Sequence, residues 1–228
     1  LLTSDSASGQ AHAATVLADM GRHSKRNRNV ILNESAVAPL IALLTQGTRD
    51  AKAEAAGALH SLSAGNPETQ KLIAEAGAIK PLVALLGEDH NLARKKAAGA
   101  IAALSLDMLQ NQDAVEKFMG IGKLVGLLGA SISDEVRAEA AAALAVLALD
   151  NRKNQDKLAA DGGIAPLVGL LKEDTSEYAK EQASAALMSL AKKHYENQVA
   201  VAQAGGIAPL VACLGLASTR AQEQSAGA

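Results

Sequence analysis

The chain repeats itself every 42 or 43 residues, and this periodicity restricts the possible folds more than any other feature of the sequence. A segment of the form Ile-x-Pro-Leu-Val recurs with its first residue at Val37, Ile79, Ile121, Ile164 and Ile207. The separations are 42, 42, 43 and 43 residues, and one copy has Lys123 in place of the proline. A fixed period of this length is typical of a solenoid, in which each unit covers the apolar face of its neighbour.

A second, alanine-rich segment keeps the same register. Its copies begin at Ala55, Ala97, Ala140 and Ala183, and a further copy starts at Ser225. Alanine and leucine are strong helix formers, so each copy predicts a helix. Only 1% of the residues are aromatic. The core must therefore form by close approach of helices across small side chains.

A third segment opens with a residue that is able to cap a helix. These residues lie seven positions after the last apolar residue of the preceding alanine-rich segment, and they are Asn27, Thr69, Asn111, Asn154 and Asn197. We predict that they are N-caps, which accept hydrogen bonds from first-turn amides. The Ile or Val of the Pro-containing segment always follows ten residues later. All variation in length therefore falls between the second and third helices, in a surface loop.

The predicted unit is a short helix, a sharp corner, a second helix, a loop and a longer third helix. Glycines that can adopt the backbone angles of a tight turn mark the corner, at Gly77, Gly120, Gly162-Gly163 and Gly205-Gly206. Prolines fall in the first turn of the second helix, where a missing amide donor costs little, at Pro39, Pro81, Pro166 and Pro209.

Three helices in roughly 40–47 residues form the unit of armadillo solenoids. The chain resembles the armadillo repeat family in Ala-Gly-Ala-Ile-Lys-Pro-Leu-Val-Ala-Leu-Leu (76–86) and Ala-Ala-Gly-Ala-Ile-Ala-Ala-Leu (97–104), and the resemblance covers essentially the whole chain. It predicts an all-α, right-handed armadillo-type α-solenoid with three helices per 42–43-residue repeat. We expect a single domain, 1–228, with partial repeats at 1–26 and 197–228 and complete repeats at 27–68, 69–110, 111–153 and 154–196.

The resemblance also implies a concave groove lined by the third helices, which in the family binds extended or helical segments. The best-studied members carry a Trp and, four residues later, an Asn that grips the ligand backbone. Here the Trp position holds Thr15, Gly57, Gly99, Ala142 and Ala185, and the Asn position holds Asp19, Ser61, Ala103, Val146 and Ser189. The absence of both elements argues against a nuclear-import adaptor.

We expect a protein partner in this groove, with Glu54, Lys96 and Glu139 adding charges of mixed sign beside its small residues. A floor of Gly and Ala lacks the large aromatic anchors of many interfaces. The leading hypothesis is an interaction scaffold that binds a partner segment, for which a helix fits better than an extended basic strand. His60, which lies beside a groove position, is a candidate contact.

No residue pattern predicts chemistry, so we expect neither an enzyme nor a cofactor or metal site. No two of the five His have the i, i+4 spacing of a helical zinc site. Cys213 occupies a core position that elsewhere holds Leu. A net charge of −2 gives no excess of basic residues for binding nucleic acid, and no apolar run predicts direct membrane insertion. The expected location is cytoplasmic or nuclear.

Two alternatives stay open at this point. The first is a structural segment of a long repeat array, or a fixed subunit of a large assembly, because both ends of the sequence fall inside a unit and carry no polar capping repeat. Neighbouring repeats or subunits would then pack at both ends. The second alternative is the substrate-recruiting part of a ubiquitin ligase, with the catalytic domain elsewhere.

Overall fold

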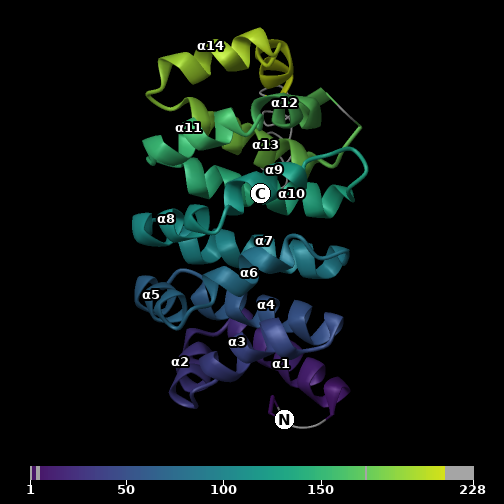
Figure 1. Cartoon of the computed structure of the whole chain (residues 1–228), viewed down its shortest axis with the longest axis vertical. Helices are drawn as coiled ribbons and strands as arrows, with labels where there is room; N and C mark the ends of the chain where they lie inside the picture. Colours follow the sequence, from purple (N-terminus) through teal and green to yellow (C-terminus); the bar gives the residue numbers. More distant parts are fainter. Residues whose placement is uncertain (1, 4–5, 173, 214–228) are drawn as a thin grey trace, which may run out of the picture.

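The computed structural model describes residues 2–3, 6–172 and 174–213, and all regular secondary structure in these residues is helical. The helices stack along the long axis of the molecule, from α1 near one end to α14 near the other (Figure 1). This confirms the predicted all-α armadillo solenoid. None of the helices within the described ranges combines the length and the apolar character needed to cross a bilayer.

Each repeat contains two short helices followed by a longer one. The first helices are α2 (Lys25–Asn33), α5 (Pro67–Glu75), α8 (Leu109–Lys117), α11 (Arg152–Ala160) and α14 (Tyr195–Gln203). The second helices are α3 (Val37–Gln46), α6 (Ile79–Leu85), α9 (Gly120–Gly126) and α12 (Ile164–Lys172), and residues 207–213 are also helical. The third helices are α1 (Ala7–Arg22), α4 (Arg49–Ser63), α7 (Asn91–Ser105), α10 (Asp134–Ala148) and α13 (Glu177–Ala191).

The third helices form a continuous row in which each packs against the one before and the one after. Alanines at one repeat position lie in these contacts, and Ala58, Ala100, Ala143 and Ala186 are all fully buried. A methyl group is a small side chain, so the helix backbones approach closely. This row explains how the chain forms a core with almost no aromatic residues.

The spacing between helices confirms where the repeats differ in length. α5 begins 12 residues before Ile79, and α11 begins 12 residues before Ile164. From Ile79 to the start of α7 is 12 residues, whereas from Ile164 to the start of α13 is 13. The extra residue therefore lies in the loop before the third helix, as predicted.

The corner between the first two helices matches the prediction at Gly77 and Gly162, which have φ of +91° and +77°. The prediction was wrong for Gly120. Met119 holds the left-handed position there, with φ +61°. Gly120 is required for a different reason, because a Cβ atom at this position would collide with the side chain and carbonyl of Val115.

The N-cap prediction was wrong by three residues in every repeat. The N-caps are Ser24, Asn66, Met108, Asn151 and His194. The predicted residues Asn27, Thr69, Asn111, Asn154 and Asn197 lie in the first turn of each helix. Asn151, for example, accepts a hydrogen bond from the backbone N–H of Asn154 at 3.2 Å.

The asparagines bind the preceding third helix. Nδ2 of Asn154 donates to the carbonyl of Leu147, seven residues earlier, at 2.9 Å. Asn111 and Asn197 make the equivalent bond at 2.6 and 3.1 Å. Carbonyls in the last turn of a helix have no partner within that helix. The seven-residue offset in the sequence therefore records a hydrogen bond between repeats.

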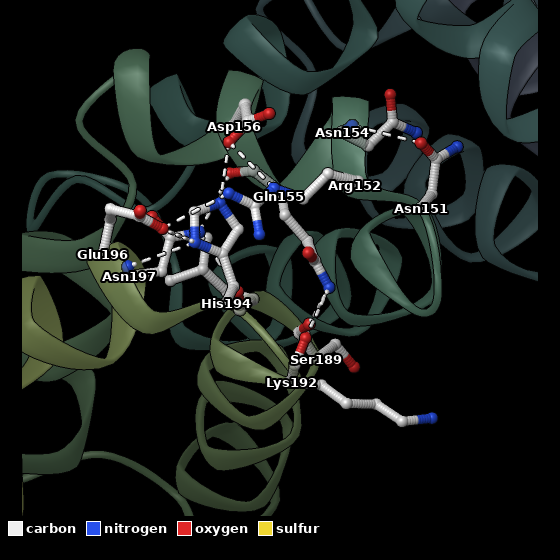
Figure 2. Close-up of polar contacts among 11 residues, drawn as sticks. Asn151, Arg152, Asn154, Gln155, Asp156, Ser189, Lys192, His194, Glu196 and Asn197 are labelled. Carbon is white, nitrogen blue, oxygen red and sulfur yellow. Dashed lines mark hydrogen bonds and ion pairs between the residues drawn. The ribbon is translucent and has the colours of Figure 1, made fainter.

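Three glutamines, each one residue after Thr69, Asn111 or Asn154, bind the third helix that follows them, whereas Gln198 bonds back to the carbonyl of Ala191. Nε2 of Gln155 donates to the carbonyl of Ser189 at 2.8 Å, and Figure 2 shows the amide directed toward the backbone of Ser189 and Lys192. Gln70 and Gln112 donate to the equivalent carbonyls at 2.6 and 3.1 Å. We call this set the polar ladder: Asn111, Asn154, Asn197, Gln70, Gln112 and Gln155.

Candidate binding groove

Eight of the thirteen predicted groove residues line one open hollow of about 440 Å³ on the row of third helices. They are Thr15, Asp19, Glu54, Gly57, Ser61, Lys96, Gly99 and Glu139. The hollow also contains Ala18, Arg22, His60, Ala64 and Lys95, so its walls come from α1, α4, α7 and α10.

The other five predicted residues lie outside the hollow, toward the C-terminal end of the row. Ala103, Ala142, Val146 and Ala185 are partly exposed, whereas Ser189 is buried. With the neighbouring Ala102, Ala145 and Met188, all of these except Ser189 carry only apolar side chains. Met188 is the most exposed of them, at 63%. We call Ala102, Ala103, Ala142, Ala145, Val146, Ala185 and Met188 the apolar half of the row.

Over Gly57, the side chain of Lys96 fills the space that a larger residue would occupy. A Cβ atom added to Gly57 would lie 3.2 Å from Cδ of Lys96. The ammonium group then reaches Glu54, with 2.6 Å between Nζ and Oε2, and both side chains are mostly buried. This ion pair joins α7 to α4.

Over Gly99, two side chains from different helices meet. A Cβ atom added to Gly99 would lie 3.1 Å from Nδ1 of His60 and 3.3 Å from Oε2 of Glu139. His60 comes from α4 and Glu139 from α10, so they reach the glycine of α7 from opposite sides. The other carboxylate oxygen of Glu139 accepts a long hydrogen bond, 3.5 Å, from the hydroxyl of Tyr178.

Burial in the walls of the hollow shifts the pKa values of His60 and Glu139 in the directions that favour their neutral forms. Desolvation lowers the pKa of His60 below its usual value, and the nearby charge of Arg22 lowers it further, although part of the ring faces solvent. Desolvation raises the pKa of Glu139, while Lys95 and the Tyr178 hydroxyl act in the opposite direction. Burial disfavours the charged form of either group.

The basic side chains of the hollow all have carboxylate partners. Arg22 contacts Asp19 at 3.2 Å, and Lys95 contacts Glu135, at the rim, at 2.7 Å. Together with the pair over Gly57, these contacts engage every lysine and arginine that lines the hollow.

Tyr178 is a contact that the sequence did not predict. Its approach to Glu139 depends on the offset between adjacent third helices, which brings the first turn of α13 beside the second turn of α10. No spacing in the sequence reports that offset. Within the described ranges, no three His, Cys, Asp or Glu side chains gather in a way that could hold a metal ion.

Comparisons with known proteins agree with the helical solenoid fold. The pattern that defines the armadillo/beta-catenin-like repeat matches residues 66–105. A designed armadillo repeat protein superposes with a TM-score of 0.84 at 29% identity, over 91% of this chain and 87% of that chain. An engineered protein of known crystal structure gives 0.86 at 32% identity, over 94% and 86% of the two chains. A designed armadillo repeat protein in complex with the peptide (KR)4 gives 0.81 at 28% identity, over 91% and 86%. A search of curated proteins gave no match.

Proposed function

The chain belongs to the armadillo repeat family, and from this premise we propose that it is an interaction scaffold whose row of third helices binds a segment of a partner protein. The observation that carries the proposal is the hollow. It gathers residues from four third helices at the positions where the family seats its ligands. A designed member of similar structure binds a peptide, which supports the same use of the fold here.

We propose that the bound segment is a helix. At the position where family members carry the Asn that grips the ligand backbone, Ser61 and Ser189 are only 8% and 3% exposed. Side chains this buried do not reach an extended peptide. The apolar half instead offers small side chains against which a helix can lie closely, and Met188 is free to adapt to its surface.

We also propose that the scaffold itself is not an enzyme. Two charged side chains of the hollow, Lys96 and Glu54, bind one another across helices. Ion pairs of this kind hold a surface in shape. A catalytic site would need a nucleophile held against a base beside an open position for the reacting atom.

The test is a charge placed in the apolar half. Ala103→Glu and Val146→Glu each put a carboxylate where the partner helix would exclude water, and an unpaired buried charge is costly. Partner recovery in a pull-down with mass spectrometry should fall at least about tenfold, which corresponds to about 1.4 kcal/mol. Leu72→Glu, on the exposed surface of α5, is the matched control and should leave recovery unchanged. Unchanged recovery with both groove variants would show that the partner binds elsewhere.

A further inference from the structure

A cluster of basic residues lies at the start of α2, on the row of first helices and away from the row of third helices. α2 begins the row of first helices along the left side of Figure 1. Although the chain as a whole is slightly acidic, residues 22–28 contain four of its 22 lysines and arginines, and residues 20–33 contain no acidic residue. His23, Lys25 and Arg26 are exposed. We call these three residues the α2 patch.

The lysine and the arginine of the α2 patch have no carboxylate partner in the fold. On the next first helix, α5, the exposed Lys71 pairs with Glu75 at 3.8 Å. Within residues 2–3, 6–172 and 174–213, by contrast, no carboxylate oxygen lies within 4.0 Å of Lys25 or Arg26. Both cations are therefore available to an outside partner.

The two arginines that flank the α2 patch are held by the fold. Arg22 contacts Asp19 at 3.2 Å, and Nη1 of Arg28 donates to the carbonyl of Gly21 at 2.7 Å. The backbone contact leaves the charge of Arg28 uncompensated. It therefore adds to the positive potential around the patch without binding a partner itself.

The α2 patch opposes the local structure of its helix. Lys25 and Arg26 lie in the first turn of α2, where the helix dipole disfavours cations. At the position of Arg26, α5 carries Glu68 and α14 carries Glu196, whose charge suits the dipole. A residue choice that opposes its local structure and gains no ion pair within the fold points to a use outside it.

We propose that the α2 patch binds an acidic segment of a protein partner, in which aspartates or glutamates follow one another. This inference goes beyond the proposed function, because the surface belongs to the first helices and needs no ligand on the row of third helices. Lys25 attracts a carboxylate as a compact charge, and the guanidinium of Arg26 holds another through two parallel hydrogen bonds.

A short acidic segment fits the α2 patch better than a nucleic acid or an anionic membrane does. The exposed carboxylates of Glu34, at the end of α2, and Glu68, on α5, lie along the same row of first helices. A long phosphate backbone or a flat lipid surface would extend over these carboxylates and be repelled by them. The net charge of −2 also differs from the basic character of most nucleic-acid-binding domains.

The experiment titrates the protein with N-acetyl-hexaglutamate amide at low salt and follows the Arg26 amide and the His23 ring by NMR. N-acetyl-hexaglutamine amide, which has the same length and no charge, is the matched control ligand. We expect only hexaglutamate to shift both signals, and we expect the shift to disappear at about 1 M salt, where charges are screened within about 3 Å. An exposed ion pair contributes up to about fivefold in affinity. The double variant Lys25→Gln/Arg26→Gln should therefore bind hexaglutamate about tenfold more weakly.

The matched control variant is Lys80→Gln/Lys117→Gln, which makes the same change of charge at exposed positions of α6 and α8. It should bind hexaglutamate as the parent does. A circular dichroism melt supplies the readout that a structural role would move. Lys25→Gln/Arg26→Gln should melt no lower than the parent, because it removes two cations from the first turn of α2. A lower melting temperature would assign the two cations to the fold and overturn the inference.

The inference also fails if hexaglutamate and hexaglutamine bind equally, or if Lys25→Gln/Arg26→Gln weakens binding no more than the control variant does. Tighter binding of a hexathymidylate strand, or of vesicles that contain phosphatidylserine, would assign the patch to another class of partner and overturn it too. Val146→Glu, which tests the proposed function, should bind hexaglutamate as the parent does. Failure of the pull-down test would therefore leave this result unchanged, and the reverse also holds.

Discussion

The polar ladder extends from the first helices to the row of third helices, and the hollow lies on that row, yet the two differ in how they use the repeat. In the ladder, successive repeats place the same two side chains in the same hydrogen bonds. In the hollow, equivalent positions carry different residues: Glu54 in α4 corresponds to Lys96 in α7 and Glu139 in α10, and His60 corresponds to Met188 in α13. Positions where the repeats agree hold the stack together. Positions where they differ are available to distinguish a partner.

The two regions are also connected through the backbone. The glutamines of the ladder donate to the carbonyls of Ala103, Val146 and Ser189, which are predicted groove positions. The ladder therefore fixes the main chain beneath the proposed binding surface, while the side chains above it vary. It follows that substitutions in the ladder should change stability, and substitutions in the hollow should change binding.

The largest effect on stability is expected at the ladder. Asn154 is fully buried, and its Nδ2 satisfies the Leu147 carbonyl at the end of α10. Asn154→Ala leaves that carbonyl without its donor, and an unpaired buried group costs about 1–3 kcal/mol. Urea denaturation followed by circular dichroism should show this loss in the free energy of unfolding.

Asn27→Ala is the matched control within the chain. Asn27 makes the equivalent bond to the carbonyl of Met20 at 3.1 Å, but at an exposed site where water can replace the donor. Its loss should be well under that of Asn154→Ala. Equal losses at the two positions would mean that burial does not set the strength of the ladder.

Most of this fold could be predicted from the repeat period, because apolar residues recur at the same spacing in each repeat and mark its helices. The positions of Ile79 and Ile164 gave the second helices, and the constant offsets located the variable loop. The caps were predicted three residues too late, because Asn at a helix start usually caps its own helix. Whether Asn154 bonds forward or back depends on the packing of the preceding helix, which no local pattern reports.

For the predicted groove too, the sequence located the residues but not the contacts that depend on helix packing. The sequence located its residues on the third helices through resemblance and register, and the structure brings eight of them together. The sequence did not show that Glu139 would have no cation as a partner while Glu54 and Lys96 form an ion pair. That difference depends on which long side chains cross between neighbouring helices.

A smaller effect is expected from exchanging the residues at one repeat position. Gly99 lies inside α7, and Ala142 is its equivalent in α10. Glycine inside a helix is less stable than alanine by about 0.5–1 kcal/mol. Gly99→Ala should therefore raise the free energy of unfolding by up to this amount, and Ala142→Gly should lower it. Thermal and urea denaturation measure both.

The same Gly99→Ala variant should recover less of the partner in the pull-down, since the added methyl lies within 3.3 Å of both His60 and Glu139. Those contacts are the ends of side chains that can move aside, so folding should tolerate the methyl better than binding does. A variant that is more stable and binds less would separate the two properties at one residue. A less stable variant would show that the space over Gly99 is part of the packing.

The smallest effect tests a position where the first helices disagree. Glu116 in α8 corresponds to Ala74 in α5 and Ala159 in α11. Its side chain is only 12% exposed, and the nearest cation, Lys157, is 4.0 Å away and held more closely by Asp161. Desolvation raises the pKa of Glu116 above its ordinary value of 4.5, and the charge of Asp161 adds to the increase.

A raised carboxyl pKa means that the folded state binds the proton more tightly than the unfolded state does. Ionised Glu116 therefore destabilises the fold above its folded pKa, and this penalty disappears as the pH falls to 4.5 and below. Glu116→Gln keeps the acceptor oxygen and should be slightly more stable than the parent at pH 7, with the gain shrinking toward pH 4.5. Glu75→Gln, at a side chain that is 68% exposed, is the matched control in urea denaturation. A gain at Glu116 that persists below pH 4.5 would assign the effect to packing instead of to the charge of the carboxylate.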